Sequence, residues 1–328
     1  TFNILKCDEY KMRIKLILLF IFMLFNQSCA HAEHAANELP MYGGERQPFT
    51  IRMPPSNLKE IAEYKNRSQE AARLGWEYYY QGDLETAIKR FNQAWLFNPD
   101  NPNVWWGFGV IQGRRGKVEK NENYYLDSIK YLKKASCLFK DNHRVMIDLS
   151  ITFTNWGESK IETDPKLARM AFDNALQWSR FAEDINANDP LLWYNRAHTQ
   201  SLIGLFKDAV INYTKAIKIE PDYVEAYNDF AWLLATCPYD EYRNGEKAVD
   251  YAKKASILLQ NNPAINDTLA AAYAEVGDFN SAVELIQKAI DLQKKEHKNN
   301  HLEEFEKRLS FYLDEKPWRD SKYTKMGE

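Results

Sequence analysis

The strongest constraint on the fold is a spacing pattern that occurs three times along the chain. In the segments GDLETAIKRFNQAW (82–95), GLFKDAVINYTKAI (204–217) and GDFNSAVELIQKAI (277–290), a Gly is followed five residues later by Ala, four later by a large residue and three later by Ala. Because residues three and four apart share one face of a helix, each segment predicts a turn followed by a helix with a small, large, small contact stripe. Small residues let a neighbouring helix approach closely, so each copy is expected to pack against another helix.

Composition agrees with a large helical protein. The 328 residues are 45% hydrophobic and 14% aromatic, with only 13 Gly and 12 Pro, so the chain can bury a core and favours helix. The formal net charge of −3 makes it a poor nucleic-acid binder, and no nucleic-acid partner is expected.

The sequence around the first copy matches a known repeat pattern. It carries, in order, Leu74, Gly75, Tyr78, Ala87, Phe91, Ala94 and Pro99. These are the Leu-Gly, aromatic, Ala, aromatic and Pro places of a 34-residue helix-turn-helix pattern. The segment therefore resembles a tetratricopeptide repeat (TPR). The resemblance implies an all-α fold, a right-handed α-solenoid of about six TPR helical hairpins.

The second Ala of the stripe sets the frame of the other repeats. It recurs as Ala94, Ala135, Ala175, Ala216, Ala255 and Ala289. The six predicted repeats are 68–101, 102–142, 143–189, 190–223, 224–262 and 263–296, of which the first, fourth and sixth are clear. Each interval between successive Ala residues of this set, except the last, is longer than the family period of about 34 residues. We expect the extra residues in turns and links, at 113–123, 157–166, 180–189 and 237–245.

Segments with other properties flank the predicted array at 68–296. Residues 33–67 are interpreted as a linker and lead-in to the first helix, because Pro and paired Gly interrupt any period. Residues 297–328 are interpreted as a C-terminal capping helix and tail. Leu302, Phe305, Leu309 and Tyr312 lie at helical spacing before Pro317, as expected of a helix that covers the last apolar face.

The chain begins with an export signal, by our interpretation. The apolar run at 14–25 is shorter than the roughly 20 residues that span a bilayer and suits the apolar region of a signal. Met12 heads a signal of normal length, so 1–11 is interpreted as an upstream extension and 12–32 as the signal region. NQSCA resembles a lipobox with Cys29 as the lipidated residue, although Asn26 departs from the apolar residue preferred there.

The cellular location of the protein depends on which of two sites in the signal region is processed. Lipidation at Cys29, the favoured alternative, would give an exported periplasmic protein anchored in the membrane, and Ala30 resembles outer-membrane sorting. Cleavage after Ala32 would instead release a soluble periplasmic protein. Both alternatives place the partner in the bacterial cell envelope.

No recognisable catalytic or cofactor motif occurs. HExxH, GxSxG, Walker-type and Cys-x-x-Cys patterns are absent, and GFGVIQG (107–113) is interpreted as helix packing around Gly109. The pairs His31/His34 and His297/His301 are expected to be solvated and to bind no metal. We therefore expect no enzyme and no cofactor.

The resemblance implies a binding groove lined by the first helices of the hairpins. Family positions transferred one by one give Trp76, Tyr79, Trp106, Arg144, Tyr194, Asn195, His198, Asn228 and Trp232. Amide and aromatic side chains suit a peptide or protein partner, whereas packing between helices is the competing interpretation for the three Trp. An alternative function is that the aromatic side chains bind peptidoglycan or an exported polysaccharide. Sedimentation with purified sacculi would distinguish this function from peptide binding. Self-association stays open.

Core positions follow from the same frame. Leu74, Phe91, Trp105, Phe108 and Tyr213 are predicted to be buried. Cys137 and Cys237 lie about three repeats apart, so they are not expected to form a disulfide, which requires alpha carbons within roughly 7 Å.

Overall fold

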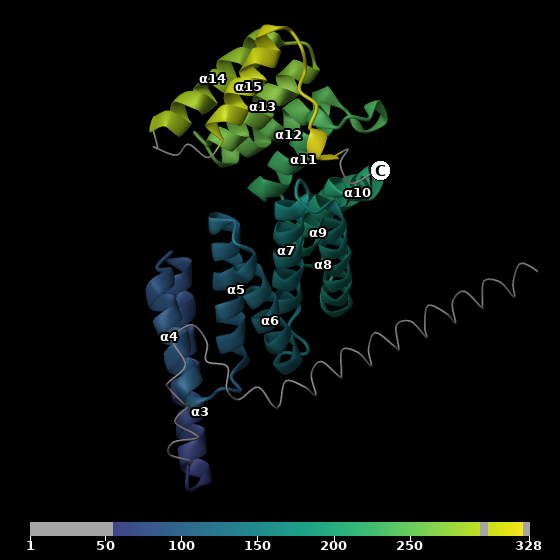
Figure 1. Cartoon of the computed structure of the whole chain (residues 1–328). Coiled ribbons are helices and arrows are strands. Elements are labelled where there is room, and N and C mark those ends of the chain that lie inside the picture. Colours follow the sequence, from purple (N-terminus) through teal and green to yellow (C-terminus); the bar gives the residue numbers. More distant parts are fainter. Residues whose placement is uncertain (1–54, 296–300, 324–328) are drawn as a thin grey trace, which may run out of the picture. The chain divides into compact units, whose positions relative to one another are not determined.

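A computed structural model describes residues 55–295 and 301–323. That part of the chain forms thirteen α-helices and two short 3-10 helices, with no strand (Figure 1). The chain divides into two compact units, Thr1–Asp141 and Asn142–Glu328, which are described separately. The signal region with Cys29, the pair His31/His34, and His297 lie outside the described residues. No helix within the described ranges is long and apolar enough to cross a membrane.

The described part of unit 1 forms two helical hairpins. Their helices are α3 (Leu58–Tyr80), α4 (Leu84–Phe97), α5 (Pro102–Glu119) and α6 (Glu122–Leu138). Helix α3 packs on α4 and α5 packs on α6, and α5 also contacts both helices of the first hairpin.

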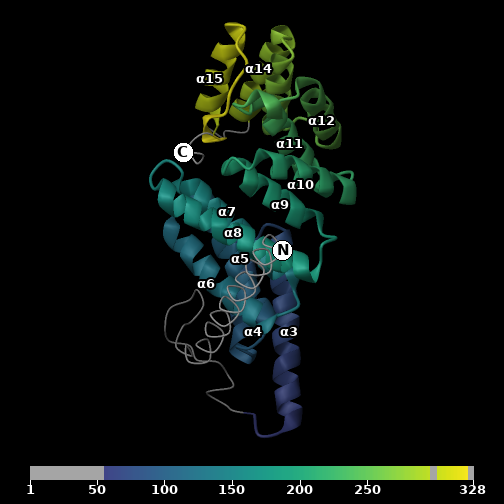
Figure 2. The ribbon, with the colours of Figure 1, turned by 90° about the vertical axis from the view of Figure 1, so that its right-hand side faces the viewer.

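Unit 2 contains four more hairpins and a final helix. The hairpins are α7 (His143–Lys160) with α8 (Pro165–Ile185), α9 (Pro190–Leu202) with α10 (Phe206–Ile219), α11 (Val224–Thr236) with α12 (Gly245–Leu258), and α13 (Pro263–Glu275) with α14 (Phe279–Lys295). The short 3-10 helix η2 (Asp240–Tyr242) precedes α12. Helix α15 (Leu302–Leu313) packs on α14 (Figure 2), and η3 (Ser321–Tyr323) follows it. The predicted all-α fold of six hairpins and a capping helix is confirmed.

Short polar residues fix where most helices begin. At ten helix starts an Asn or Asp side chain accepts a hydrogen bond from a backbone N–H of the first turn: Asn57, Asp83, Asn101, Asn121, Asn142, Asp164, Asp189, Asn244, Asn262 and Asp278. A Pro follows in the first turn of α5, α8, α9 and α13. Proline suits this position because its fixed φ is helical and its missing N–H would have no helical partner.

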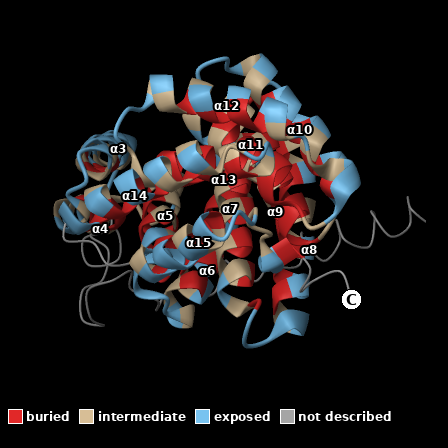
Figure 3. Cartoon of the chain, turned by 90° about the horizontal axis from the view of Figure 1, so that it is seen from above, coloured by how far each residue is buried: buried red, intermediate tan, exposed pale blue. Residues whose placement is uncertain are grey.

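The repeated stripe is buried in every copy, as predicted. Figure 3 marks buried residues in red, and most of the labelled helices carry both buried and exposed residues. The residues of the stripe are at most 1% exposed: Ala87, Phe91 and Ala94; Ala209, Tyr213 and Ala216; Ala282, Ile286 and Ala289. The Gly that precedes each stripe has φ between +78° and +85°, a conformation that side-chain-bearing residues rarely adopt. The spacing therefore recurs because each hairpin needs the same left-handed turn and the same close contact.

Three of the four predicted loop insertions are wrong. Residues 113–119 continue α5, residues 157–160 continue α7, and residues 180–185 continue α8. The inserted Arg, Lys and Glu residues are good helix formers, and the partner helix of each hairpin is lengthened with them. Only the segment at 237–245 is a long turn, which contains η2.

The predicted core residues are buried with one partial exception. Phe91, Trp105, Phe108 and Tyr213 are at most 3% exposed, whereas Leu74 is half-buried. Gly109 lies inside α5 against α6, where an added Cβ would lie 2.4 Å from Leu132 Cγ, so GFGVIQG is a helix-packing segment as interpreted. Cys237 is a free and buried thiol, in agreement with the absence of a Cys137–Cys237 disulfide.

Candidate partner-binding face

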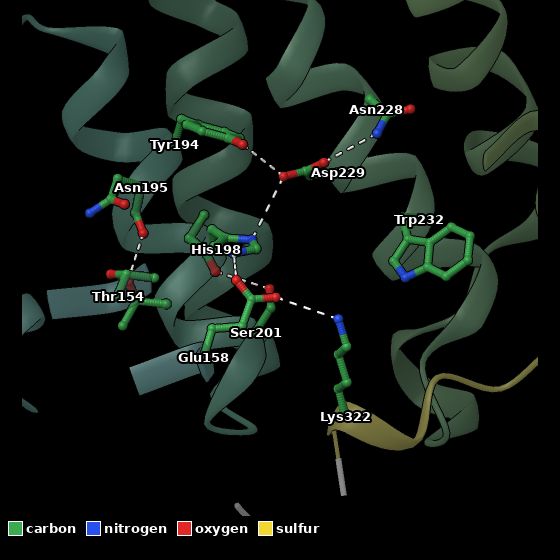
Figure 4. Close-up of polar contacts among 12 residues, drawn as sticks. Thr154, Glu158, Tyr194, Asn195, His198, Ser201, Asn228, Asp229, Trp232 and Lys322 are labelled. Carbon is green, nitrogen blue, oxygen red and sulfur yellow. Dashed lines mark hydrogen bonds and ion pairs between the residues drawn. The ribbon is translucent and has the colours of Figure 1, made fainter. Parts of the chain in front are cut away.

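The first helices of the unit 2 hairpins, α7, α9, α11 and α13, form what we call the first-helix face. Two pairs of predicted site residues lie on it, each pair one helical turn apart. Tyr194 and His198 come from α9, and Asn228 and Trp232 come from α11 (Figure 4). Tyr194, His198 and Asn228 meet around a fifth residue, and Trp232 lines a cavity beside them.

That central residue is Asp229, next to Asn228 on α11. Its Oδ2 accepts a hydrogen bond from the Tyr194 hydroxyl at 2.8 Å, and its Oδ1 accepts one from Asn228 Nδ2 at 3.2 Å. His198 Nδ1 lies 3.7 Å from Asp229 Oδ2, and its Nε2 lies 3.8 Å from Glu158 Oε2 on α7. The imidazole therefore lies between two carboxylates from two neighbouring helices.

Tyr194 acts as a fixed donor in this network. Burial raises the pKa of its hydroxyl well above the ordinary value, and the nearby Asp229 carboxylate adds to the shift. Its ring stacks on His198 at 6.4 Å between centroids and contacts Tyr223 at 5.2 Å. The hydroxyl thus stays protonated near neutral pH and holds the Asp229 carboxylate in place.

A cavity of about 430 Å³ lies beside this network in unit 2. Its lining includes Asn228, Asp229, Trp232, Asp267, Arg308 and Asp320. Asn228 Oδ1 is buried and accepts no hydrogen bond within the described residues. The Trp232 indole N–H donates to Asp320 Oδ2 at 2.9 Å, and the Arg308 guanidinium lies 5.2 Å from the Trp232 ring centroid. The cavity therefore offers hydrogen-bonding groups beside aromatic rings.

A buried ion pair forms part of the cavity wall. Arg308 Nε on α15 donates to Asp267 Oδ1 on α13 at 2.8 Å, and both residues are 6% exposed. Burial raises the pKa of Asp267 to about 6, although the Arg308 charge opposes this shift. The pair fixes the capping helix against the last hairpin.

The three predicted site residues of unit 1 form an aromatic cluster. Trp76 contacts Trp106 at 4.7 Å and Tyr79 at 5.6 Å between ring centroids, both in edge-to-face geometry. Trp76 also lies 5.3 Å from the core residue Phe91, and all three cluster residues are half-buried. These contacts favour the packing interpretation for Trp76 and Trp106.

The structure places two predicted site residues away from the cluster. Asn195 is 5% exposed, and its Nδ2 donates to Ser150 Oγ at 2.7 Å between α9 and α7, so its assignment to the groove is corrected to a helix-packing role. Arg144 is exposed and pairs with Asp189 at 2.5 Å, near the start of α7. It lies roughly 20 Å along that helix from Glu158.

Sequence reasoning missed several residues of this face. Asp229 precedes Trp232 by almost one helical turn, a signal that could have included it. Glu158 was missed because its segment was predicted to be a turn. Asp320 and Lys322 gave no signal, since their contacts depend on the chain returning from α15. Within the described residues, no group of three or more His, Cys, Asp or Glu side chains could hold a metal ion.

Comparisons with known proteins identify the repeats. A family model described as TPR repeat matches residues 75–116, and one described as tetratricopeptide repeat matches 191–223 and 264–296. The chain contains tetratricopeptide repeats. The two tetratricopeptide matches coincide with the fourth and sixth hairpins, which the sequence indicated most clearly.

Similar proteins share the TPR architecture. A TPR repeat-containing protein of Methanocaldococcus jannaschii is 25% identical over 173 residues, which are 52% of this chain. The chain spans only 28% of that relative's length. The Cut9–Hcn1 hetero-tetramer of APC/C has a TM-score of 0.57 at 14% identity, over 79% of this chain and 50% of the other. PilF of Pseudomonas aeruginosa has a TM-score of 0.53 at 14% identity, over 75% and 99% of the respective chains. These likenesses support a TPR α-solenoid fold.

Proposed function

We propose that the chain is a non-catalytic binding module that presents the first-helix face of unit 2 to an extended segment of a protein or peptide partner. The observation that carries this proposal is the convergence of Tyr194, His198, Asn228 and Asp229 beside Trp232 and a cavity. Repeat folds of this kind build extended binding surfaces from side chains of successive repeats.

The face offers the interactions that a peptide backbone requires. Asn228 lines the cavity, and its Oδ1 is a buried acceptor without a hydrogen bond among the described residues, so a partner N–H that enters the cavity would satisfy it. The Trp232 ring provides an apolar surface, and its indole N–H provides a donor. Tyr194 and Asp229 hold one another in place, so the surface is formed before the partner arrives and less entropy is lost on binding.

Partner capture should depend on this face. Crosslinking in intact cells, followed by purification of the tagged protein, is expected to recover a partner with the wild type. The variant Asn228→Ala/His198→Ala should lose about 90% of it, because removing two contacts at roughly 1 kcal/mol each weakens binding at least tenfold. Asp250→Ala, an exposed change on the second helix α12, is the matched control and should retain the partner. Equal recovery with all three proteins, each checked for native helicity, would contradict the proposal.

We also propose that the module works in the cell envelope. The support is the apolar run at 14–25 and the lipobox-like residues around Cys29. Fractionation should find the wild type with the membranes and Cys29→Ser in the soluble periplasmic fraction, since a covalent lipid anchors the wild type. Periplasmic wild type would favour cleavage after Ala32, and cytosolic wild type would exclude the envelope proposal.

A further inference from the structure

The chain after α15 folds back onto the first-helix face. Helix α15 ends at Leu313, and Glu315, with φ of 53°, turns the chain while its N–H donates to Tyr312 O at 3.1 Å. The following residues reach η3 beside the site network, where Lys322 is seen in Figure 4. We call residues 314–323 the return segment.

The return segment occupies groups that a partner of this face would use. Asp320 Oδ2 accepts the Trp232 indole N–H at 2.9 Å, and the Asp320 backbone N–H donates to Thr236 O at 3.0 Å. Lys322 Nζ lies 3.5 Å from Glu158 Oε1, at the carboxylate that also approaches His198. A single short segment thus contacts α7 and α11 through side chains of opposite charge.

Aromatic and ionic contacts hold the middle and the end of the segment. Trp318 packs edge-on against Phe311 of α15 at 5.0 Å between centroids, and Arg319 Nη1 lies 2.7 Å from Glu275 Oε2. Tyr323 is 7% exposed and meets the Phe206 ring edge-on at 5.6 Å. The segment therefore combines a half-buried and a buried aromatic anchor with polar contacts at the site.

Few backbone hydrogen bonds fix residues 317–323 to the helices. Of residues 317–323, only Asp320 exchanges a backbone hydrogen bond with the first-helix face. The Lys322–Glu158 pair is half-exposed, and such pairs contribute little stability. A segment held mainly by side chains can detach while the helices beneath it stay folded.

We propose that the return segment is an intramolecular ligand of the first-helix face, and that a partner binds by displacing it with an extended segment of the same chemistry. That partner segment carries a carboxylate for the Trp232 N–H, followed two residues later by a cation for Glu158 and then an aromatic ring. The inference rests on the proposed function, because it names the partner class for the same face.

A peptide supplied in trans tests the displacement. The probe is a fluorescent synthetic peptide of residues 314–323, titrated against the full chain. We expect it to bind the variant Trp318→Ala/Asp320→Ala/Tyr323→Ala, which we call the released variant, at least about tenfold more tightly than the wild type. In the wild type the tethered segment competes with the peptide at high effective concentration. Equal affinity for both proteins, or binding to neither, would overturn the inference.

Two controls tie binding to the proposed contacts. Adding Trp232→Phe to the released variant keeps an aromatic ring but removes the indole N–H, and should weaken peptide binding about fivefold. A peptide with Asp320→Ala should lose affinity for the released variant to a similar extent. If neither change weakens binding, the peptide does not occupy the site seen for the return segment.

Hydrogen exchange of the wild type tests detachment without any variant. The amide of Asp320 should exchange about a hundredfold faster than the amide of Ala231, which is in α11 and fully buried. Equal rates would show that the segment leaves only when the protein unfolds, which would overturn the inference. Peptide displacement without any partner captured in cells would confirm the return segment as an intramolecular ligand of the face and would count against the proposed function alone.

Discussion

Replacing Arg308 by Met is expected to lower the free energy of unfolding by about 3–5 kcal/mol, the usual cost of breaking a buried ion pair on one side. Arg308 Nε is the donor to Asp267 at 2.8 Å, and the substitution leaves that carboxylate buried at 6% exposure without its charge partner. Denaturant unfolding of the full chain measures the loss.

The same chemical change at an exposed pair is the matched control. Arg169 lies 3.3 Å from Asp173 on α8 and is about half-exposed, so Arg169→Met should change stability by about 0.5 kcal/mol or less. A loss for Arg308→Met no larger than that of the control would show that the buried pair does not hold α15 in place.

The pH dependence of this variant has a definite sign. Burial raises the pKa of Asp267 to about 6 from the ordinary 3.8 even with Arg308 present, so without Arg308 the pKa rises further. A carboxyl whose pKa is raised by folding contributes stability at pH values below its pKa in the unfolded state. That stability is lost as the pH rises through its pKa in the folded state. The deficit of Arg308→Met should therefore be larger at pH 8 than at pH 5.

Replacing Phe91 by Ala is expected to cost about 3–5 kcal/mol in unit 1, because it opens a cavity in a close-packed contact. Phe91 is 0% exposed, and its ring fills the space beside two glycines. A Cβ added at Gly107 would lie 2.3 Å from the ring, and one added at Gly75 would lie 2.8 Å from it. Thermal and denaturant unfolding would measure the effect.

Gly107 provides an internal check on that interpretation. In the wild type, Gly107→Ala should destabilise by about 1–3 kcal/mol, since the new methyl group overlaps the Phe91 ring. In the Phe91→Ala background, the same substitution should stabilise by up to about 1 kcal/mol, because the space is open and Ala favours helix over Gly. Additive effects of the two changes would contradict direct contact between these positions.

The features that recur along the chain could be predicted from local sequence. The stripe Ala87, Phe91 and Ala94 and its two later copies predicted the hairpins, and the buried positions of the stripe are confirmed. These signals are local because every hairpin must make the same turn and bury the same face. Three of the inserted segments were predicted to be loops because a polar segment of helix-forming residues has the same composition as a polar loop. Whether such a segment is helix or loop depends on packing against the partner helix of the hairpin.

The candidate site was predicted in part. Tyr194, His198 and Asn228 meet at Asp229, and Trp232 lines the cavity beside them, because family positions fix which residues share a helix face. Asn195 shares that helix but faces Ser150 of α7, and its burial depends on how closely two helices pack.

The sequence by itself determined the repeating helices, their starts and their buried stripes, since these depend on residues within one or two turns of each other. Only the tertiary structure decided that Asp229 is the centre of the polar network and that Asp320 meets Trp232. Contacts between residues so far apart in the chain depend on the path of the intervening helices. No spacing within a single segment records that path.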